Sequence, residues 1–176
     1  MATTKLSAAD FVTFGYGQVE PNHLSAQITG QIYAQLPLSK DIEVLENGMF
    51  AKYDYENKEV NLTGAGEWML VYNTIKIYDE DEVDNDYAMK NIVANGKAVV
   101  VPASTDVVPR LFKTNVGDIF TTNTIKAADL KEGDELAPGA DGYLAIAGDD
   151  ATMKWQVVKV YTMPDMQKGV KIMRIA

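Results

Sequence analysis

Apolar and polar residues alternate along much of this chain, and the alternation predicts β-strands. It runs through Ile75–Tyr78, Lys154–Val157 and Val170–Ile172, as expected of strands that bury one face. Val99–Val101 is instead a continuous β-branched run, which fits a strand buried on both faces. We therefore expect several short strands and little regular helix.

Glycine-containing turn signals separate these strand patterns. Glycine supplies the positive φ that a tight reversal needs, so such signals mark the ends of strands. They occur at Asn47-Gly48, Gly64-Ala65-Gly66, Asn95-Gly96 and Asp141-Gly142. Many short strands with frequent turns predict a mainly β fold, either a small barrel or a sandwich.

Helical signals are short and local. Leu6–Phe11 fits an N-terminal turn in which Ser7 caps the first residues. Asp84–Ala94 ends at an Asn-Gly pair, and Lys126–Glu132 ends at Gly133. We expect short helical turns at these places, none long enough to organise a core.

Both tryptophans of the chain follow the same local pattern. Trp68 comes after the turn Leu45-Glu46-Asn47-Gly48, and Trp155 comes after Leu130-Lys131-Glu132-Gly133. Two related β modules, with Trp68 and Trp155 as their core anchors, would produce this repeat. Two unrelated strands that each need a large core residue would produce it as well, because strands favour aromatic residues.

The chain divides by composition into three parts. Residues 1–40 form an N-terminal arm and first strand, residues 41–88 a first β module, and residues 89–176 a second β module packed with the first as one unit. Residues 11–35 carry one charged side chain, Glu20, among many Gly, Gln and aromatic residues. Such a segment can lie extended across a partner's surface, or it can be an ordinary first strand of the domain.

The charge of the chain is uneven. The formal net charge of the 176 residues is −9, and residues 1–88 hold 15 acidic and 5 basic side chains. An acidic surface repels nucleic acid and anionic lipid, so we expect neither as a partner. The chain has no cysteine and no long apolar run, so disulfides, a signal peptide and a membrane span are not expected.

The usual signatures of catalysis are missing from the sequence. His23 is the only histidine, and none of the four serines lies in a Gly-x-Ser-x-Gly turn. The Gly15-Tyr16-Gly17 and Gly64-Ala65-Gly66 runs lack the third glycine of a dinucleotide-binding loop. We expect a protein that is not an enzyme and that has no cofactor or metal. A glycan-active enzyme with paired carboxylates stays an alternative, because the sequence does not give carboxylate separations.

The run Asp79–Asp86 is the one dense charge cluster. Calcium loops need glycine at their sixth position, and Asp84 stands there when the count starts at Asp79. Like charges at this density repel one another and extend the chain. We expect a solvated acidic loop without a tightly bound ion.

Tyr53 and Tyr55 stand two residues apart. On a strand this spacing puts both side chains on one face, where they could stack against a sugar ring. Cross-strand pairing of aromatic side chains on a sheet face explains the same spacing.

Several phrases of the sequence resemble those of the head decoration proteins of tailed bacteriophages, also called cement or auxiliary capsid proteins. The uncharged N-terminal segment carries part of this resemblance. The other phrases are Leu45–Asp54, Val116–Asn123, Gly133–Leu136 and Asp141–Leu144. They cover most of the chain, although each is a turn-and-strand phrase.

The resemblance implies a non-enzymatic virion protein. It would be made in the host cytoplasm, bind the major capsid protein on the outer surface of an assembled phage head and stabilise the capsid. Some such proteins are trimers, so the resemblance allows a homo-oligomer. In this interpretation the N-terminal segment contacts the capsid through Phe11, Phe14, Tyr16, Ile28, Ile32 and Tyr33. The alternative is a carbohydrate-binding module or phage fibre domain, which would use exposed Tyr53, Tyr55 or Tyr72.

Overall fold

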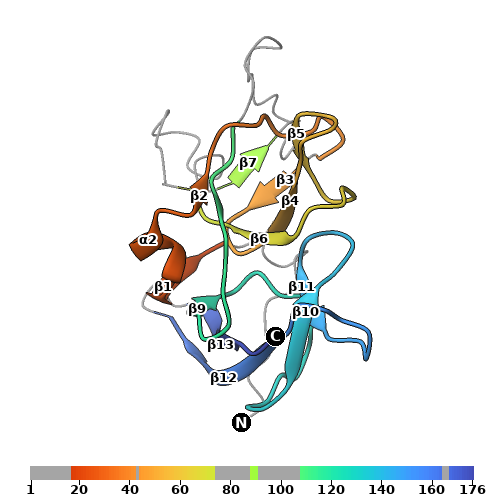
Figure 1. Cartoon of the computed structure of the whole chain (residues 1–176). Helices are drawn as coiled ribbons and strands as arrows, with labels where there is room; N and C mark the ends of the chain where they lie inside the picture. The colour runs from red at the N-terminus through yellow and green to blue at the C-terminus, as the bar shows by residue number, and fades with distance from the viewer. Residues whose placement is uncertain (1–16, 43, 74–87, 91–107, 164–166) are drawn as a thin grey trace, which may run out of the picture.

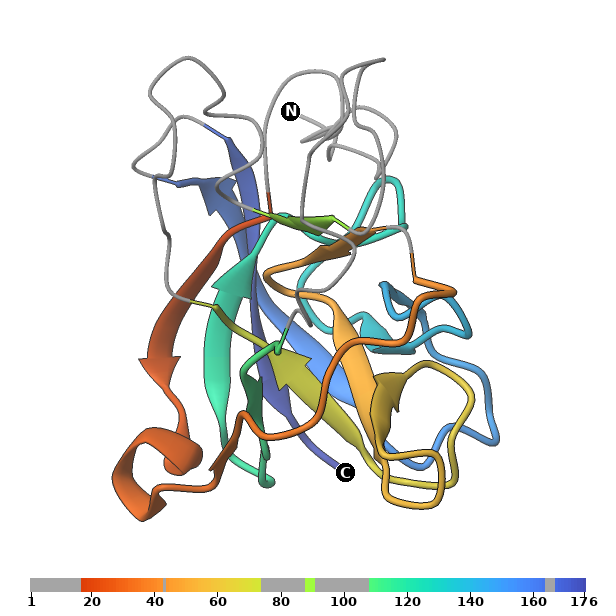
Figure 2. The same ribbon diagram turned by 90° about the horizontal axis from the view of Figure 1, so that it is seen from above.

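The fold is mainly β, as the alternation predicted. The computed structural model describes residues 17–42, 44–73, 108–163 and 167–176, together with the backbone of residues 88–90. Within these residues the strands form two larger sheets and one small one, and one short helix occurs. The two larger sheets lie one above the other in Figure 1, and Figure 2 gives the view from above. No helix in the described residues is long and apolar enough to cross a membrane.

The larger sheet is antiparallel and curls into a half-barrel. Its strands, in spatial order, are β1 (Val19–His23), β9 (Ile119–Thr122), β13 (Lys168–Arg174), β12 (Trp155–Thr162), β10 (Glu135–Pro138) and β11 (Leu144–Ile146). The chain that leaves β9 turns back to the opposite edge, where Ile125 forms a bridge with Leu144 of β11. The edge formed by β11 is therefore partly covered by the chain itself.

The second sheet has five strands and lies above the half-barrel. In spatial order they are β2 (Ile32–Tyr33), β8 (Leu111–Phe112), β6 (Trp68–Val71), β4 (Phe50–Asp54) and β5 (Glu59–Asn61). Leu38 bridges to Val60, so the segment before residue 42 covers the β5 edge. A two-stranded sheet of β3 (Val44–Glu46) and β7 (Ala88–Lys90) completes the described strands.

The five-stranded sheet separates two hydrophobic cores. Strand β6 shows how: Trp68 and Leu70 pack into the core between the two sheets, whereas Met69 and Val71 pack into a second core on the other side. Successive side chains of a strand point to opposite faces, so a strand with both faces buried must be apolar throughout. In the core between the sheets, Phe50 from one sheet meets Trp155 from the other, with ring centroids 5.7 Å apart.

The same three-strand unit occurs in both sheets. The orders β5-β4-β6 and β11-β10-β12 are equivalent, and a glycine with positive φ precedes the central strand of each, Gly48 at 91° and Gly133 at 94°. The Gly48 amide donates to the Val71 carbonyl, and the Gly133 amide donates to the Val157 carbonyl, at 3.0 and 2.8 Å. The two glycine turns are thus followed by the same strand arrangement.

Two helix predictions are wrong. Lys126–Glu132 forms turns, because the Lys126 amide donates to the Leu144 carbonyl and Asp129 has a φ of 54°, which no helix allows. Within Asp84–Ala94, the described residues Ala88–Lys90 form strand β7 and pair with β3. The helix that does form is α2 (Ser25–Thr29), which ends at Gly30 with a left-handed φ of 72°.

The predicted turns that can be compared are confirmed. Asn47-Gly48, Gly64-Ala65-Gly66 and Asp141-Gly142 all lie between strands, and Gly142 has a φ of 81°. Other predictions fall outside the described residues. These are the strands Ile75–Tyr78 and Val99–Val101, the turns Leu6–Phe11 and Asn95-Gly96, and the acidic run Asp79–Asp86.

Candidate functional site

The described part of the N-terminal segment connects the two sheets. Strand β1 forms an edge of the six-stranded sheet through its pairing with β9, and β2 forms an edge of the five-stranded sheet through its pairing with β8. Val19, Leu24 and Ala26 are buried in the core between the sheets. Residues 17–35 are therefore part of the folded body, with the helix α2 between its two strands (Figure 1).

The six residues expected to contact a capsid have different environments. Phe11, Phe14 and Tyr16 lie outside the described residues. Ile32 is half-buried against the core between the sheets, and Tyr33 is half-buried against the second core. Ile28, on α2, has 78% of its surface exposed. It is thus the one member of the set in the described residues whose side chain is mostly free to contact a partner.

Helix α2 is fixed to the turn before β9 by a buried carboxylate. Asp118 is 1% exposed, and its side chain accepts hydrogen bonds from the Ser25 amide, the Ser25 hydroxyl and the Asn115 amide, each 2.9 Å long. The Asn115 side-chain amide donates to the Ser25 hydroxyl at 2.7 Å. A buried carboxylate is tolerated only when its oxygens are satisfied in this way, so the helix and the turn are held side by side.

This arrangement places two exposed aliphatic side chains on neighbouring elements. Ile28 lies on α2, and Val116, which is 68% exposed, lies in the turn that Asp118 fixes. Three exposed residues near them in sequence, Gln27, Gln31 and Asn115, are uncharged, and the partly exposed Lys113 and Arg174 lie beside this set. We call this set the helix–turn surface, and it consists of Gln27, Ile28, Gln31, Asn115 and Val116. Its five residues carry no charge, although the net charge of the chain is −9.

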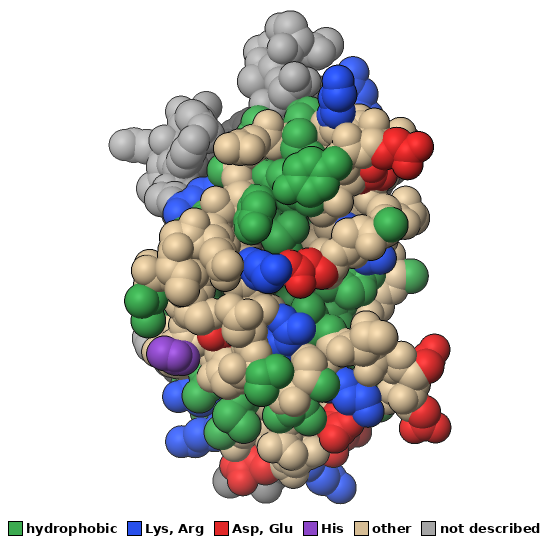
Figure 3. Space-filling view, in the orientation of Figure 1, with side chains coloured by type: hydrophobic (Ala, Val, Ile, Leu, Met, Phe, Trp, Pro, Cys, Tyr) green, Lys and Arg blue, Asp and Glu red, His purple; other side chains and the backbone are tan. Residues whose placement is uncertain are grey.

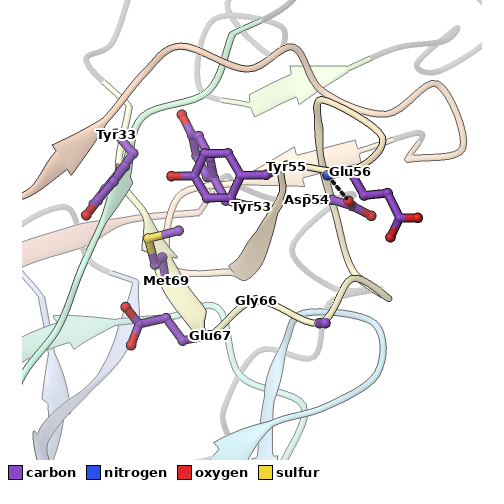
Figure 4. A pocket seen from close by; sticks show the side chains of 9 residues that line it. Tyr33, Tyr53, Asp54, Tyr55, Glu56, Gly66, Glu67 and Met69 are labelled. Carbon is purple, nitrogen blue, oxygen red and sulfur yellow. Dashed lines mark hydrogen bonds between the residues drawn. The ribbon is translucent and has the colours of Figure 1, made fainter.

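A second candidate site is a pocket on the five-stranded sheet, which we call the tyrosine pocket. It has a volume of about 400 Å³. Its lining residues are Tyr33, Tyr53, Asp54, Tyr55, Glu56, Ala65, Gly66, Glu67 and Met69. Figure 4 shows Tyr33 on one side, Tyr53 and Tyr55 on the other, and Met69 between them. The pocket is therefore built from β2, β4 and β6 and the loops beside them.

The three tyrosine rings form a continuous group. Tyr53 lies in the middle, with its ring centroid 5.4 Å from that of Tyr33 and 5.7 Å from that of Tyr55. Tyr53 and Tyr55 thus lie together, as their two-residue spacing predicted. Their exposure differs, because Tyr53 is 4% exposed and Tyr55 is 69% exposed. The Tyr53 hydroxyl accepts a hydrogen bond from the Gln35 amide at 2.9 Å, which fixes the central ring.

Asp54 organises the turn at one end of the pocket. Its carboxylate accepts hydrogen bonds from the amides of Glu56 and Asn57 and from the side-chain amides of Asn57 and Asn61, at 2.9 to 3.0 Å. The bonds from Asn57, with those from Asn61 and Glu56, lower the pKa of Asp54 from 3.8 to about 2. The carboxylate is therefore ionised at any pH near neutrality.

At the other end, Glu67 forms an ion pair with Lys113, with 2.8 Å between the carboxylate oxygen and the ammonium nitrogen. Both side chains are well exposed. In the space-filling view, hydrophobic side chains gather on the upper part of the visible face (Figure 3). The pocket thus joins an aromatic centre to an acidic rim.

Two further cavities are lined by fewer exposed aromatic and charged side chains. One, of about 610 Å³, lies beside Tyr72, Phe112 and Arg110, with the Tyr72 and Phe112 ring centroids 5.4 Å apart. The other, of about 310 Å³, is lined by Trp68, Ile146 and small residues of the β10–β11 hairpin. Neither contains an aromatic side chain as exposed as Tyr55.

The tryptophans and the histidine have clear positions. Trp155 is fully buried, and its ring contacts those of Phe50 and Phe120. Trp68 is only partly buried, with the Lys52 ammonium 4.5 Å from its ring centroid. His23 is exposed on β1. In the described residues no group of three or more His, Cys, Asp or Glu side chains could hold a metal ion.

Sequence reasoning missed Val116, Asp118 and Glu67 as candidate site residues. Val116 and Asp118 belong to the phrase Val116–Asn123, where an apolar residue beside Gly117 is a weak signal of an exposed turn. Glu67 has no such signal, because its place beside Tyr33 depends on the order of the strands.

Comparison of the chain with protein families, with curated proteins and with solved structures finds no match.

Proposed function

We propose that the protein is a non-enzymatic structural component of a tailed-phage virion, which binds the outer surface of the assembled head and stabilises it. The proposal starts from the sequence phrases that resemble those of head decoration proteins. The observation that carries it further is the helix–turn surface, where Ile28 and Val116 are exposed on two elements that the Asp118 hydrogen bonds hold together.

The composition of this surface supports a protein partner. Protein–protein interfaces are depleted in charged residues at their centre, and the five exposed residues of the helix–turn surface are all uncharged. The Asp118 hydrogen bonds fix the surface before binding, so little conformational entropy would be lost on contact. The acidic remainder of the body would stay in solvent.

The geometry of a capsid favours this mode of binding. One contact of about 800 Å² per partner gives modest affinity once the loss of translational and rotational freedom is subtracted. A molecule that touches two neighbouring capsid subunits can gain about 10² to 10⁴ in avidity without stronger individual contacts. A small folded body with one rigid uncharged surface suits such repeated, moderate contacts.

The test is co-sedimentation of the purified chain with heads assembled from the major capsid protein encoded in the same genome. We expect the wild-type chain to bind and to raise the temperature at which the heads break. Ile28→Glu and Val116→Glu should each weaken binding about tenfold or more, the loss typical of a central interface residue. Ile146→Glu is the matched control, because Ile146 is also an exposed aliphatic residue, at 60%, but lies on β11.

Two results would contradict the proposal at different levels. If the wild-type chain ignores the heads, or the genome holds no major capsid gene, the decoration function is wrong. If the wild type binds and both glutamate variants bind equally well, the function stands and the helix–turn surface is not the contact. Circular dichroism of each variant would show that it is folded.

A further inference from the structure

The charged residues that line the tyrosine pocket are all acidic. Asp54, Glu56 and Glu67 line it, and none of its lining residues is basic. Lys113 neutralises Glu67 from outside the lining, which leaves two carboxylates without a basic partner among the described residues. The low pKa of Asp54 keeps its charge present at neutral pH. The pocket is therefore attractive to a cation and repulsive to an anion.

The aromatic rings add to this preference. The face of a tyrosine ring carries negative charge density and attracts a cation within about 6 Å of its centre. Tyr55 is 69% exposed and Tyr33 is half-exposed, so both rings can be reached from solvent. Figure 4 shows the two rings on opposite sides of Met69, whose flexible thioether can adapt to a bound ligand.

The polar groups of the pocket are less suited to a sugar. A glycan site needs free acceptors and donors for hydroxyl groups beside the stacking ring. The Asp54 carboxylate already accepts hydrogen bonds from two backbone amides and two side-chain amides. The Tyr53 hydroxyl accepts the Gln35 amide. What these residues offer a ligand is mainly ring surface and negative charge.

One carboxylate at the rim of the pocket already has a cationic partner. The Lys113 ammonium lies 2.8 Å from Glu67, at the end of the pocket that Tyr33 borders. Glu67 is therefore already paired, and the carboxylates left for a ligand are those of Asp54 and Glu56. We propose that the tyrosine pocket binds an arginine or lysine side chain of another polypeptide, with the cation against the exposed ring of Tyr55 and near the carboxylates of Asp54 and Glu56. This site does not depend on the capsid proposal.

The test uses the ¹⁵N-labelled full chain and three short capped peptides. Gly-Arg-Gly and Gly-Lys-Gly carry the cation, and Gly-citrulline-Gly has the shape of the arginine peptide without its charge. For a single side chain we expect a Kd of about 1 to 10 mM, so the titrations should reach about 100 mM at constant ionic strength. Amide shifts should saturate at residues 33, 53–56 and 66–69 for the charged peptides alone.

Substitutions identify the groups that bind. Tyr55→Phe should keep the affinity, because the ring remains, whereas Tyr55→Ala should raise the Kd about fivefold, which corresponds to about 1 kcal/mol for one exposed cation–π contact. Glu56→Gln should raise the Kd about twofold, because a surface charge pair contributes little. Glu132→Gln is the matched control, since Glu132 is an exposed carboxylate that does not line the pocket.

Several outcomes would overturn the proposal. Equal binding of the citrulline peptide would remove the charge argument, and absence of any saturable shift would remove the site. Shifts spread over the acidic surface and unchanged in Tyr55→Ala would indicate unspecific attraction. Saturation of the same amides by a neutral tetrasaccharide, with no response to the arginine peptide, would instead support the carbohydrate-binding alternative. None of these results bears on binding to heads.

Discussion

Gly48 and Gly133 allow a matched test of the repeated three-strand unit. Both precede the central strand of their unit, and both have a φ near 90°, where a side chain is strained. Their surroundings differ. A Cβ atom on Gly48 would collide with the hydroxyl oxygen of Thr122, whereas a Cβ atom on Gly133 would meet no atom within 4 Å. Alanine at each position therefore separates backbone strain from crowding.

The expected costs follow from these two terms. An alanine with positive φ costs about 1 to 2 kcal/mol, and about 0.4 to 1 kcal/mol returns because alanine restricts the unfolded chain. Gly133→Ala should therefore lower the free energy of unfolding by about 1 kcal/mol. Gly48→Ala adds overpacking against Thr122, which costs about 1 to 3 kcal/mol more. We expect a total loss of about 2 to 4 kcal/mol at Gly48.

Urea denaturation followed by far-UV circular dichroism measures both losses. The m-value of each variant should equal that of the wild type, which shows that the same surface is exposed on unfolding. Gly48→Ala should cost less in a Thr122→Ala background than in the wild type, because the nearest colliding atom is gone while Thr124 stays close. The reference for this comparison is Thr122→Ala alone, which loses the hydrogen bond from the Thr124 amide. Equal losses for the two single variants, or a smaller loss at Gly48, would refute the reasoning from the contacts of Gly48.

Three further outcomes are expected. Trp155→Ala should lower the free energy of unfolding by about 3 to 5 kcal/mol. Trp155→Phe should cost less than half of that, because the buried indole nitrogen has no hydrogen-bond partner in the described residues. Equal losses for the two variants in urea denaturation would contradict this expectation. Asp118→Ala should destabilise the protein and shift the amide signals of α2, and unchanged signals would mean that Asp118 does not fix the helix. Carbon NMR should give the Asp54 carboxyl a pKa of about 2. The contribution of this carboxylate to the stability of the fold is complete above pH 3.8 and is lost as the pH falls through about 2. An ordinary pKa would contradict the hydrogen bonds from Asn57.

The sequence predicted the described strands well where one face of a strand is buried. Trp155–Thr162 and Lys168–Arg174 contain the alternating runs, because side chains on the solvent face had to be polar. The turns at Gly48 and Gly142 were readable, since only glycine readily adopts their φ. These features depend on local chain geometry, which neighbouring residues in the sequence encode.

Helices and long-range contacts were harder to predict. Helix α2 has five residues and is held by Asp118, which lies 93 positions from Ser25 in the sequence. Its one local signal is Gly30, whose left-handed φ ends the helix. The sequence predicted only part of the tyrosine pocket. The spacing of Tyr53 and Tyr55 indicated paired rings, but Tyr33 joins them only through the order of the strands.

The tryptophan pattern found in the sequence is offset from the repeat in the structure. The glycine hydrogen bonds make Val71 equivalent to Val157, and Trp68 lies three residues before Val71 whereas Trp155 lies two before Val157. A shift of one residue along a strand moves a side chain to the other face of the sheet. The position equivalent to Trp155 is therefore Met69, which packs into the second core.

This offset explains how the two sheets share one core. A tryptophan at the position of Met69 would point away from the half-barrel, into the core covered by the segment that contains Leu38 and Ile42. With the offset, Trp68 and Trp155 both pack into the core between the sheets, one from each side. Trp68 stays partly exposed because it lies at the rim, where Lys52 covers its ring. Truncating Trp68 should therefore cost less than truncating Trp155, although the sequence pattern treats the two residues alike.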